Sequence, residues 1–309
     1  MRLIIVIFTL IWFSCNNVNT NQQNSTSTSM ENTKKNQIDW QGHRGARGIL
    51  PENTIPAFLK ALEYSVTTLE LDIAISKDSV VIVSHEPWFN HAISTHPDGT
   101  PITEEEEKDL AIYEMTYEQI KEFDVGSRGN PKFPDQKPMK AHKPSLADMV
   151  NAVKKYCKEN EKPLPNYNIE VKSQPSYYDK KTPAPAAYVK IVLDEVDRLG
   201  IKDQSNLQSF DINILEEIHR QSPSTVVAYL VESTDSLAKT LEKISFKPDI
   251  FSPYFLLLNQ EIVDALHAKD IKVIPWTVNR KEDMKRMIEI GVDGIITDYP
   301  NYIEEVSKM

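Results

Sequence analysis

Residues 67–75 read TTLELDIAI and residues 167–172 read YNIEVK. Alternate side chains of a β-strand point to opposite faces, so Glu70 shares a face with Asp72, and Glu170 shares one with Lys172. The positions between them hold leucine, isoleucine and valine, which would face apolar packing. Two strands that direct charge to one face and hydrocarbon to the other predict a hard-cation site on a packed barrel or sheet.

Strand-like and helix-like segments alternate through the rest of the chain. The expected strands are Trp40–His43, Thr67–Ile75, Val80–Ser84, Tyr167–Val171, Asn206–Phe210, Thr225–Leu230, Asp249–Ser252, Lys272–Thr277 and Gly294–Thr297. The expected helices are Thr54–Ser65, Ser145–Cys157, Ala184–Leu199, Asp211–Arg220, Ser236–Ile244, Gln260–Lys269 and Arg280–Ile290. Ser145 and Asp211 are predicted N-caps.

This alternation over residues 40–309 predicts an α/β fold of the TIM (β/α)₈ barrel type, and the length fits one such domain. Nine strands are one too many for the barrel, so one of them is expected to be peripheral or wrongly assigned. A doubly wound open sheet is the alternative, although no Gly-rich phosphate loop follows an early strand.

The alternation stops between residues 86 and 144, after the strand that ends at His85. This interval is rich in proline, contains Gly99, Gly126 and Gly129, and includes one short expected helix at Tyr117–Glu122. Long irregular segments after a strand commonly form active-site lids. We expect an insertion that caps the mouth of the barrel, with a purely structural appendage as the alternative.

The first 15 residues have the character of a secretory signal. Arg2 precedes an apolar stretch from Leu3 to Phe13 that is short for a membrane span, and Ser14 and Cys15 follow it. A small residue before a cysteine at this place is similar to a bacterial lipobox, which predicts lipidation of Cys15, with a plain cleaved signal or a retained anchor as alternatives. Every one of these readings predicts an exported protein, and lipidation would make it a membrane-anchored lipoprotein of the cell envelope.

Residues 16–39 contain seven Asn and seven Ser or Thr, with few large apolar side chains. Such a segment cannot bury enough surface to offset its chain entropy, so we expect a flexible tether. The formal net charge of the whole chain is −10. This charge argues against nucleic acid as the main partner, since phosphate backbones require basic surfaces.

Several short motifs occur in a fixed order along residues 40–309. They are Gly42-His43-Arg44-Gly45, Pro51-Glu52-Asn53-Thr54, Glu70-Leu71-Asp72, Ser84-His85-Glu86-Pro87, Glu170-Val171-Lys172, Gln208-Ser209-Phe210, Pro275-Trp276-Thr277-Val278-Asn279 and Gly294-Ile295-Ile296-Thr297-Asp298. Together with the insertion after His85, this ordered set resembles the glycerophosphodiester phosphodiesterase family. One departure is Glu86, where the family usually has Asp.

The resemblance implies a TIM barrel, one divalent cation (Ca²⁺ or Mg²⁺), and hydrolysis of glycerophosphodiesters to sn-glycerol 3-phosphate and an alcohol. By residue matching it implies metal ligation by Glu70, Asp72 and Glu170, and acid–base catalysis by His43 and His85. It also implies phosphate contacts from Arg44 and Lys172, and an aromatic pocket wall at Trp276. Glu52 is expected behind these residues or as favourable charge near a helix start.

The residue types suit this chemistry in their own right. A phosphodiester is an anion, so a divalent cation, an Arg fork and a Lys can each stabilise its transition state. Carboxylate-only ligation favours Ca²⁺ or Mg²⁺ over zinc, and two imidazoles can remove one proton and donate another. No Gly-x-Ser-x-Gly elbow and no Walker loop occur, which disfavours a serine nucleophile or an NTPase.

Two alternatives to a glycerophosphodiester phosphodiesterase remain open at this point. One is a phospholipase D-like enzyme that acts on lysophospholipid or sphingolipid headgroups, and the other is a lipoprotein that binds phosphodiesters without catalysis. The mostly polar composition of residues 86–144 favours small soluble substrates over lipids. By the family's proposed course, the glycerol 2-hydroxyl attacks its own phosphate to give a cyclic phosphate, which water then opens.

Overall fold

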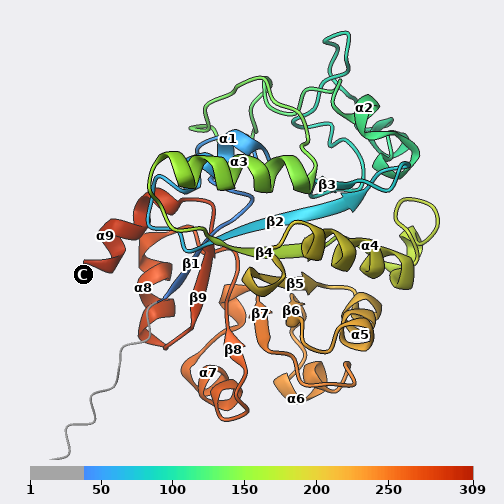
Figure 1. Ribbon diagram of the computed structural model, residues 1–309. Helices are drawn as coiled ribbons and strands as arrows, with labels where there is room; N and C mark the ends of the chain where they lie inside the picture. Colours follow the sequence, from blue (N-terminus) through green and yellow to red (C-terminus); the bar gives the residue numbers. More distant parts are fainter. Residues whose placement is uncertain (1–37, 309) are drawn as a thin grey trace, which may run out of the picture. The chain divides into compact units, whose positions relative to one another are not determined.

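Eight parallel strands form a nearly closed barrel in the computed structural model, which describes residues 38–308 (Figure 1). Neighbouring strands follow the order β8-β7-β6-β5-β4-β2-β1-β9. The strands are β1 (Asp39–Gly42), β2 (Thr68–Ile75), β3 (Val81–Val83), β4 (Asn166–Val171), β5 (Ser205–Ser209), β6 (Val226–Val231), β7 (Ile250–Pro253), β8 (Lys272–Val273) and β9 (Gly294–Thr297). This arrangement confirms the predicted TIM barrel. The surplus strand is β3, which pairs antiparallel with β2 outside the barrel path.

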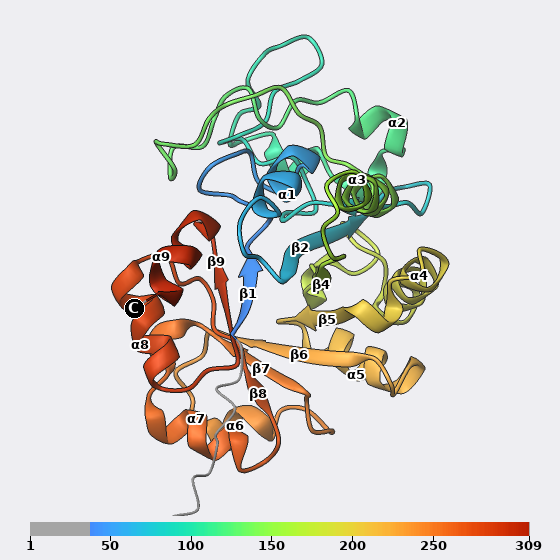
Figure 2. The same ribbon diagram turned by 60° about the vertical axis from the view of Figure 1, so that its left-hand side comes forward.

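Helices alternate with the strands and surround them (Figure 2). They are α1 (Ile55–Ala61), α2 (Tyr117–Ile120), α3 (Leu146–Glu159), α4 (Pro185–Arg198), α5 (Ile212–Gln221), α6 (Leu237–Leu241), α7 (Gln260–His267), α8 (Lys281–Glu289) and α9 (Ile303–Ser307). Both predicted N-caps are confirmed, since Ser145 accepts a hydrogen bond from Asp148 N and Asp211 accepts one from Asn213 N. Helix α9 was not anticipated.

The strand expected at Lys272–Thr277 is shorter than predicted, because β8 ends at Val273. Pro275 lies two residues later and has no N–H to donate to a strand ladder. Single hydrogen bonds from Ile274 N to Phe251 O and from Trp276 N to Pro253 O keep this segment beside β7. Trp276 is thereby carried to the mouth of the barrel.

Strand periodicity separates the packing layers as predicted. Leu69, Leu71 and Ile73 of β2 are fully buried in the large core between the strands and the helices. The alternate residues Glu70 and Asp72 are also buried, but they face the barrel interior. Registration of β2 with β4 pairs Asp72 with Glu170, which brings the charged positions of the two strands side by side.

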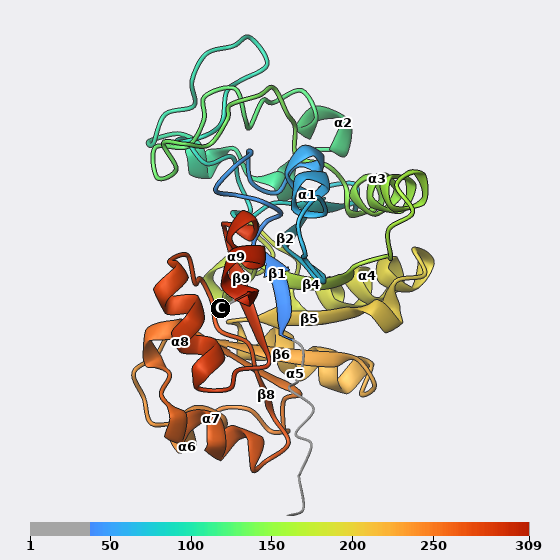
Figure 3. The same ribbon diagram turned by 90° about the vertical axis from the view of Figure 1, so that its left-hand side faces the viewer.

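The insertion between β3 and α3 lies on the side of the barrel that carries α1 and α3 (Figure 3). It contains α2 and has its own small core around Phe89, Ile112, Ile120 and Phe123. The rings of Phe89 and Phe123 stack with centroids 4.1 Å apart. The insertion is therefore a packed unit attached to the barrel, although it has little regular secondary structure.

The predicted signal segment, the lipidation at Cys15 and most of the tether fall outside the described residues, which begin at residue 38. Among residues 38–308, no helix combines the length and the apolar character needed to cross a membrane.

Candidate active site

A cavity of about 200 Å³ opens at the carboxyl ends of the barrel strands, the face on which TIM-barrel active sites lie. Predicted site residues that line it are His43, Arg44, Glu70, His85, Glu170, Lys172 and Trp276. Further lining residues are Arg47, Gln208, Phe210, Leu230, Thr277 and Ile296. The structure thus brings together residues that lie more than 230 positions apart in the chain.

The three predicted metal ligands converge. Glu70, Asp72 and Glu170 each offer an oxygen atom, and these atoms lie within 4.8 Å of one another. Asp72 Oδ1 is buried and has no hydrogen-bond partner among the described residues. Buried polar atoms normally have a partner, and a bound cation would supply one. A buried set of three carboxylates with only oxygen donors fits Ca²⁺ or Mg²⁺.

Burial and mutual repulsion raise the pKa of two members of this triad. Burial, together with Asp72 and Glu170, raises the pKa of Glu70 well above its usual range. Burial, opposed by Lys172 but assisted by Asp72, raises the pKa of Glu170 to about 7. The pKa of Asp72 is instead low, because Arg44, His85 and Lys172 outweigh burial. A divalent cation would relieve this repulsion.

His43 belongs to a buried pair with Asp298. Its Nδ1 lies 2.6 Å from Asp298 Oδ1, and an ionised carboxylate can only accept, so Nδ1 carries the proton. Nε2 then presents a lone pair, and it lies 3.9 Å from Glu70 Oε2. Burial lowers the pKa of His43 although Asp298 opposes the shift. Asn279 fixes Asp298 in turn, donating to its Oδ2 at 2.7 Å and accepting from its backbone N–H at 2.9 Å.

His85 repeats this design with a different carboxylate. Its Nδ1 lies 2.8 Å from Glu86 Oε1, which also accepts from Asn90 Nδ2 at 3.1 Å. Burial, with Arg44 and Lys172, lowers the pKa of His85. Glu86, the departure from the family pattern, therefore still supplies the carboxylate. An imidazole oriented through Nδ1 can remove a proton through Nε2 when it is neutral and donate one when it is protonated, so the pair has the groups for acid–base catalysis.

Arg44 is held in an unusual backbone conformation that serves the triad. Its φ is 51°, in the left-handed region that non-glycine residues rarely adopt. This conformation directs its N–H to Glu70 Oε2 at 3.0 Å, and its C=O accepts from Asn53 N. Gly45 follows with φ 84°, and a Cβ there would lie 2.6 Å from the backbone of Ala57. The His-Arg-Gly sequence therefore fixes a tight turn against α1.

The Arg44 side chain lies between two carboxylates. Its Nη1 donates to Glu52 Oε1 at 2.6 Å, and its Nε lies 3.2 Å from Asp72 Oδ2. Lys172 Nζ lies 2.8 Å from Glu170 Oε1 and 3.8 Å from Asp72 Oδ1. The positively charged Arg44 and Lys172 side chains therefore border the triad and line the cavity, where they can contact a phosphate.

The two remaining predicted residues have defined places. Glu52 is buried and bridges Arg44 to Arg47, whose Nε donates to its Oε2 at 2.7 Å. Trp276 donates through Nε1 to Ser252 O at 2.9 Å, and its ring meets the exposed ring of Phe210 edge-on at 5.4 Å. These aromatic rings form one wall of the cavity.

Residues of the insertion contact Arg47, which lines the cavity, and Glu52 and Ser84 next to it. Phe133 lies against the Arg47 guanidinium, 4.7 Å from ring centroid to Cζ, and Asn130 Nδ2 donates to Glu52 Oε2 at 3.2 Å. Lys143 is buried and donates to Ser84 Oγ at 2.7 Å, beside the His85–Glu86 pair. Within residues 38–308, no residue between Pro87 and Pro144 lines the cavity. The insertion thus supports Arg47, Glu52 and Ser84, and the expected cap over the mouth of the barrel stays a prediction.

Sequence reasoning missed the roles of four residues. Asp298 and Gln208 stand in motifs that were recognised, yet neither was given a role, and Glu86 was noted only as a departure. Arg47 lies three residues after a motif residue and was not considered. A position just after a barrel strand is a usable signal, and by that criterion Asp298, which follows β9, could have been found. Glu86 follows β3, outside the barrel path, so its only signal was its place beside His85.

One mouth of this TIM barrel combines a buried carboxylate triad, two carboxylate-paired histidines, and arginine and lysine side chains. This combination is that of an enzyme that cleaves phosphodiesters. Residues 43–302 match the Glycerophosphoryl diester phosphodiesterase family, and the chain belongs to this family of enzymes. The family resemblance drawn from the motifs is thereby confirmed.

Individual relatives agree along most of the chain. A glycerophosphodiester phosphodiesterase of Caldanaerobacter subterraneus is 28% identical over 264 residues, covering 84% of this chain and 93% of the relative. The crystal structure of a candidate glycerophosphoryl diester phosphodiesterase from Silicibacter pomeroyi is 33% identical, with a TM-score of 0.77 and coverage of 87% and 92%. A phosphodiesterase of Oleispira antarctica, solved with the product sn-glycerol-3-phosphate, shares the fold at 18% identity, with a TM-score of 0.69 and coverage of 88% and 97%.

Proposed function

We propose that this enzyme hydrolyses glycerophosphodiesters to sn-glycerol 3-phosphate and an alcohol. The observation that carries the proposal is the meeting of two carboxylate-paired histidines, His43 and His85, with the Glu70, Asp72 and Glu170 triad at one small cavity. The volume of about 200 Å³ suits a substrate of few heavy atoms. The product bound to the Oleispira antarctica relative supports the same substrate class.

Each group has a task in this reaction. Glu70, Asp72 and Glu170 would hold one Ca²⁺ or Mg²⁺ ion, which supplies charge neutralisation for the phosphate. Lys172 and Arg44 offer further positive charge to the phosphoryl oxygens. The Phe210 and Trp276 rings give an apolar surface for the carbon chain of glycerol.

The histidines carry the protons. We propose that the glycerol 2-hydroxyl attacks phosphorus and gives its proton to one imidazole Nε2, while the bond from phosphorus to the headgroup oxygen breaks. The other histidine starts protonated at Nε2 and donates that proton to the departing alkoxide. Water then opens the cyclic phosphate with the two roles exchanged. Glycerophosphodiesters that lack the 2-hydroxyl would show no turnover under this scheme, and full activity on them would reject it.

A substrate panel tests the activity. Glycerophosphocholine, glycerophosphoethanolamine, glycerophosphoglycerol and glycerophosphoinositol are incubated with the enzyme, and sn-glycerol 3-phosphate is measured with chelator and after addition of Ca²⁺, Mg²⁺ or Mn²⁺. We expect activity that chelator abolishes and a divalent ion restores. His43→Ala should remove the activity, whereas His267→Ala, at a half-exposed histidine paired with Asp293, should not. A protein that binds these diesters without turnover would be the non-catalytic alternative.

The phospholipase D-like alternative is favoured by one observation. Phe210 is 40% exposed and Leu256 is 61% exposed, and the chain near Leu256 borders Trp276 through the hydrogen bond from Phe255 N to Trp276 O. An exposed apolar rim can contact lipid. Lysophosphatidylcholine and sphingomyelin therefore belong in the same panel, and faster release of headgroup from them than from any glycerophosphodiester would favour the alternative.

We also propose that the enzyme is exported and held at a membrane of the cell envelope by a lipid on Cys15. The proposal is supported by the sequence of residues 1–15 alone. Expressed in a bacterium with labelled fatty acid, the full chain should incorporate the label and Cys15→Ala should not. Equal labelling of the two proteins, or no labelling of the full chain, would contradict lipidation of Cys15.

A further inference from the structure

Three buried amide side chains cross the barrel interior and end on the metal triad. Gln41, Asn168 and Gln208 are each no more than 2% exposed. Asn168 Nδ2 donates to Gln41 Oε1 at 2.7 Å and to Gln208 Oε1 at 3.2 Å. Gln208 Nε2 donates to Glu70 Oε1 at 2.9 Å. We name Gln41, Asn168 and Gln208 the amide chain.

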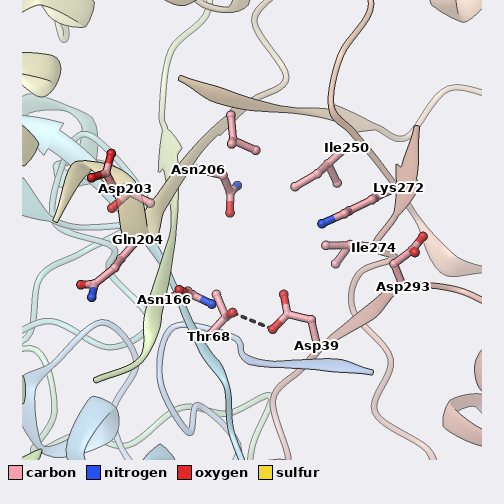
Figure 4. Close-up of a pocket in the computed structure, with 12 residues that line it drawn as sticks. Asp39, Thr68, Asn166, Asp203, Gln204, Asn206, Ile250, Lys272, Ile274 and Asp293 are labelled. Carbon is pink, nitrogen blue, oxygen red and sulfur yellow. Dashed lines mark hydrogen bonds between the residues drawn. The ribbon is translucent and has the colours of Figure 1, made fainter. Parts of the chain in front are cut away.

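The far end of the amide chain also meets a carboxylate. Gln41 Nε2 donates to Asp39 Oδ2 at 2.7 Å. Asp39 lines a second cavity, of about 600 Å³, at the amino ends of the strands. Figure 4 shows this cavity, with Asp39 and Asn206 at its wall. Asn206 Nδ2 donates to Asn168 Oδ1 at 2.5 Å. Hydrogen-bonded side chains thus run from one mouth of the barrel to the other.

A count of donors and acceptors determines which way the oxygen and the NH₂ group of each side-chain amide in the amide chain point. The count begins at Asp39, because an ionised carboxylate only accepts. Asp39 takes an N–H of Gln41, so the Gln41 oxygen must face Asn168, whose amide NH₂ has two donors. Asn168 uses both donors on the carbonyl oxygens of Gln41 and Gln208, while its own oxygen is occupied by Asn206. Gln208 must therefore turn its oxygen toward Asn168 and its N–H toward Glu70. Reversal of any one amide would place two acceptors or two donors in contact, at a depth where unmet polar groups are costly.

We infer that Asn168 is a positioning residue for the metal site, although the structure gives it no contact with any of the three carboxylates. It holds Gln208 in the one orientation that presents a donor to Glu70 Oε1. Arg44 N–H holds Oε2 of the same carboxylate at 3.0 Å. With both oxygens anchored, Glu70 is fixed in the geometry that a cation needs before the cation arrives. The inference rests on the proposed divalent-cation site.

The replacement Asn168→Asp tests the direction of the hydrogen bonds. An aspartate has nearly the same shape but no donor, so Gln41 and Gln208 lose the groups that orient them. Gln208 is then free to turn its oxygen toward Glu70. Outer residues that orient metal ligands typically account for 10- to 100-fold in affinity, so we expect the dissociation constant for Mg²⁺, Ca²⁺ and Mn²⁺ to rise about 10- to 100-fold in isothermal titration calorimetry. Asn168→Leu removes the donors without a charge and should weaken binding in the same direction.

A matched control lies on the same strand. Asn166→Asp makes the same chemical change two residues earlier on β4, where Asn166 lines the far cavity and has no side-chain hydrogen bond among the described residues. We expect the control to bind metal as the native enzyme does. All variants are compared in metal-free form by thermal unfolding, so that affinity is measured on folded protein.

Folded Asn168→Asp and Asn168→Leu proteins that bind metal within twofold of the native enzyme would overturn the inference. A native enzyme that binds none of the three ions would overturn the inference together with the proposed metal site. These two failures are distinguishable, because the first leaves metal binding by the native enzyme intact.

Discussion

The two halves of the barrel interior differ sharply in chemistry. Strands β1, β2, β4 and β5 direct amides and carboxylates inward, and the residues are Gln41, Glu70, Asp72, Asn168, Glu170 and Gln208. Strands β6, β7 and β9, with the segment after β8, instead contribute a small apolar cluster of Ala228, Ile250, Ile274 and Ile296. We refer to these as the polar half and the apolar half.

The outer faces of the two halves are alike. Leu69 and Ile169 on the polar side, and Val227, Phe251 and Ile295 on the apolar side, all belong to the same core beneath the helices. Burial of such side chains stabilises each half by a similar mechanism. The difference inside therefore shows a division of tasks. The polar half carries buried charge that metal binding can use. The apolar half fills the barrel mainly with hydrocarbon, and its buried Ser252 hydroxyl donates to Ile274 O.

The largest effect is expected where the polar half loses a charge. Glu170→Gln keeps the size of the side chain but removes one of three metal carboxylates. Metal assistance is typically worth several kcal/mol of transition-state stabilisation, so kcat/KM should fall by about 10³-fold or more. The melting temperature of the metal-free protein should not fall, because the pKa of Glu170, raised to about 7, shows that its charge is unfavourable in the fold. Retention of a tenth of the activity would contradict the role of Glu170.

A second test compares two ends of one strand. Asp298→Asn, after β9, removes the carboxylate that orients His43, and kcat should fall by about 10²- to 10⁴-fold if proton transfer is impaired. Asp298 raises the pKa of His43, so the limb of the pH–rate profile that reports His43 should move to lower pH in the residual activity. Asp293→Asn lies just before β9 and also faces a histidine, since His267 Nε2 lies 2.8 Å from Asp293 Oδ2. This control should keep kcat, and an equal loss in both variants would contradict an orienting role of Asp298.

Proton competition gives a third and smaller effect. Glu170 has a pKa raised to about 7 in the metal-free protein, so it holds a proton below that pH and must release it when a cation binds. Glu70, whose pKa is also raised, holds a further proton that a cation must displace. Metal affinity should therefore fall by at least tenfold per pH unit below pH 7. Calorimetry in two buffers of different ionisation enthalpy should detect the released proton. An affinity that is constant between pH 5.5 and 8 would contradict this assignment.

The alternation of strand and helix patterns sufficed to predict the barrel, whereas the metal triad was assigned by resemblance to a known family. Period-two alternation placed Glu70 with Asp72, and the apolar residues between them identified the packed face. The register of β2 against β4 then brings the third carboxylate to the site, since it pairs Asp72 with Glu170.

The partners of the site residues could not be predicted in this way. The pair of His43 and Asp298 spans 255 positions and forms only because β9 returns to β1. The contact of Arg47 with Phe133 depends on how an irregular insertion folds back, and no periodic pattern describes such a segment. The hydrogen bonds of the amide chain could not be predicted for a related reason. Gln41, Asn168 and Gln208 lie on three different strands, and only the closure of the barrel brings their side chains into contact.

The smallest effect is expected in the apolar half, and it sharpens the comparison most directly. Ile250→Val removes one buried methylene group from the barrel interior, a change that typically costs about 0.5–1.5 kcal/mol of unfolding free energy. The melting temperature should fall by a few degrees at most, while kcat and metal affinity stay unchanged. Ile169→Val, on the outer face of β4, should lower stability by a similar amount, because both sites lose the same packing. A loss of metal affinity in Ile250→Val at unchanged affinity in Ile169→Val would mean that the apolar half also shapes the metal site, and the division of tasks within the barrel would not hold.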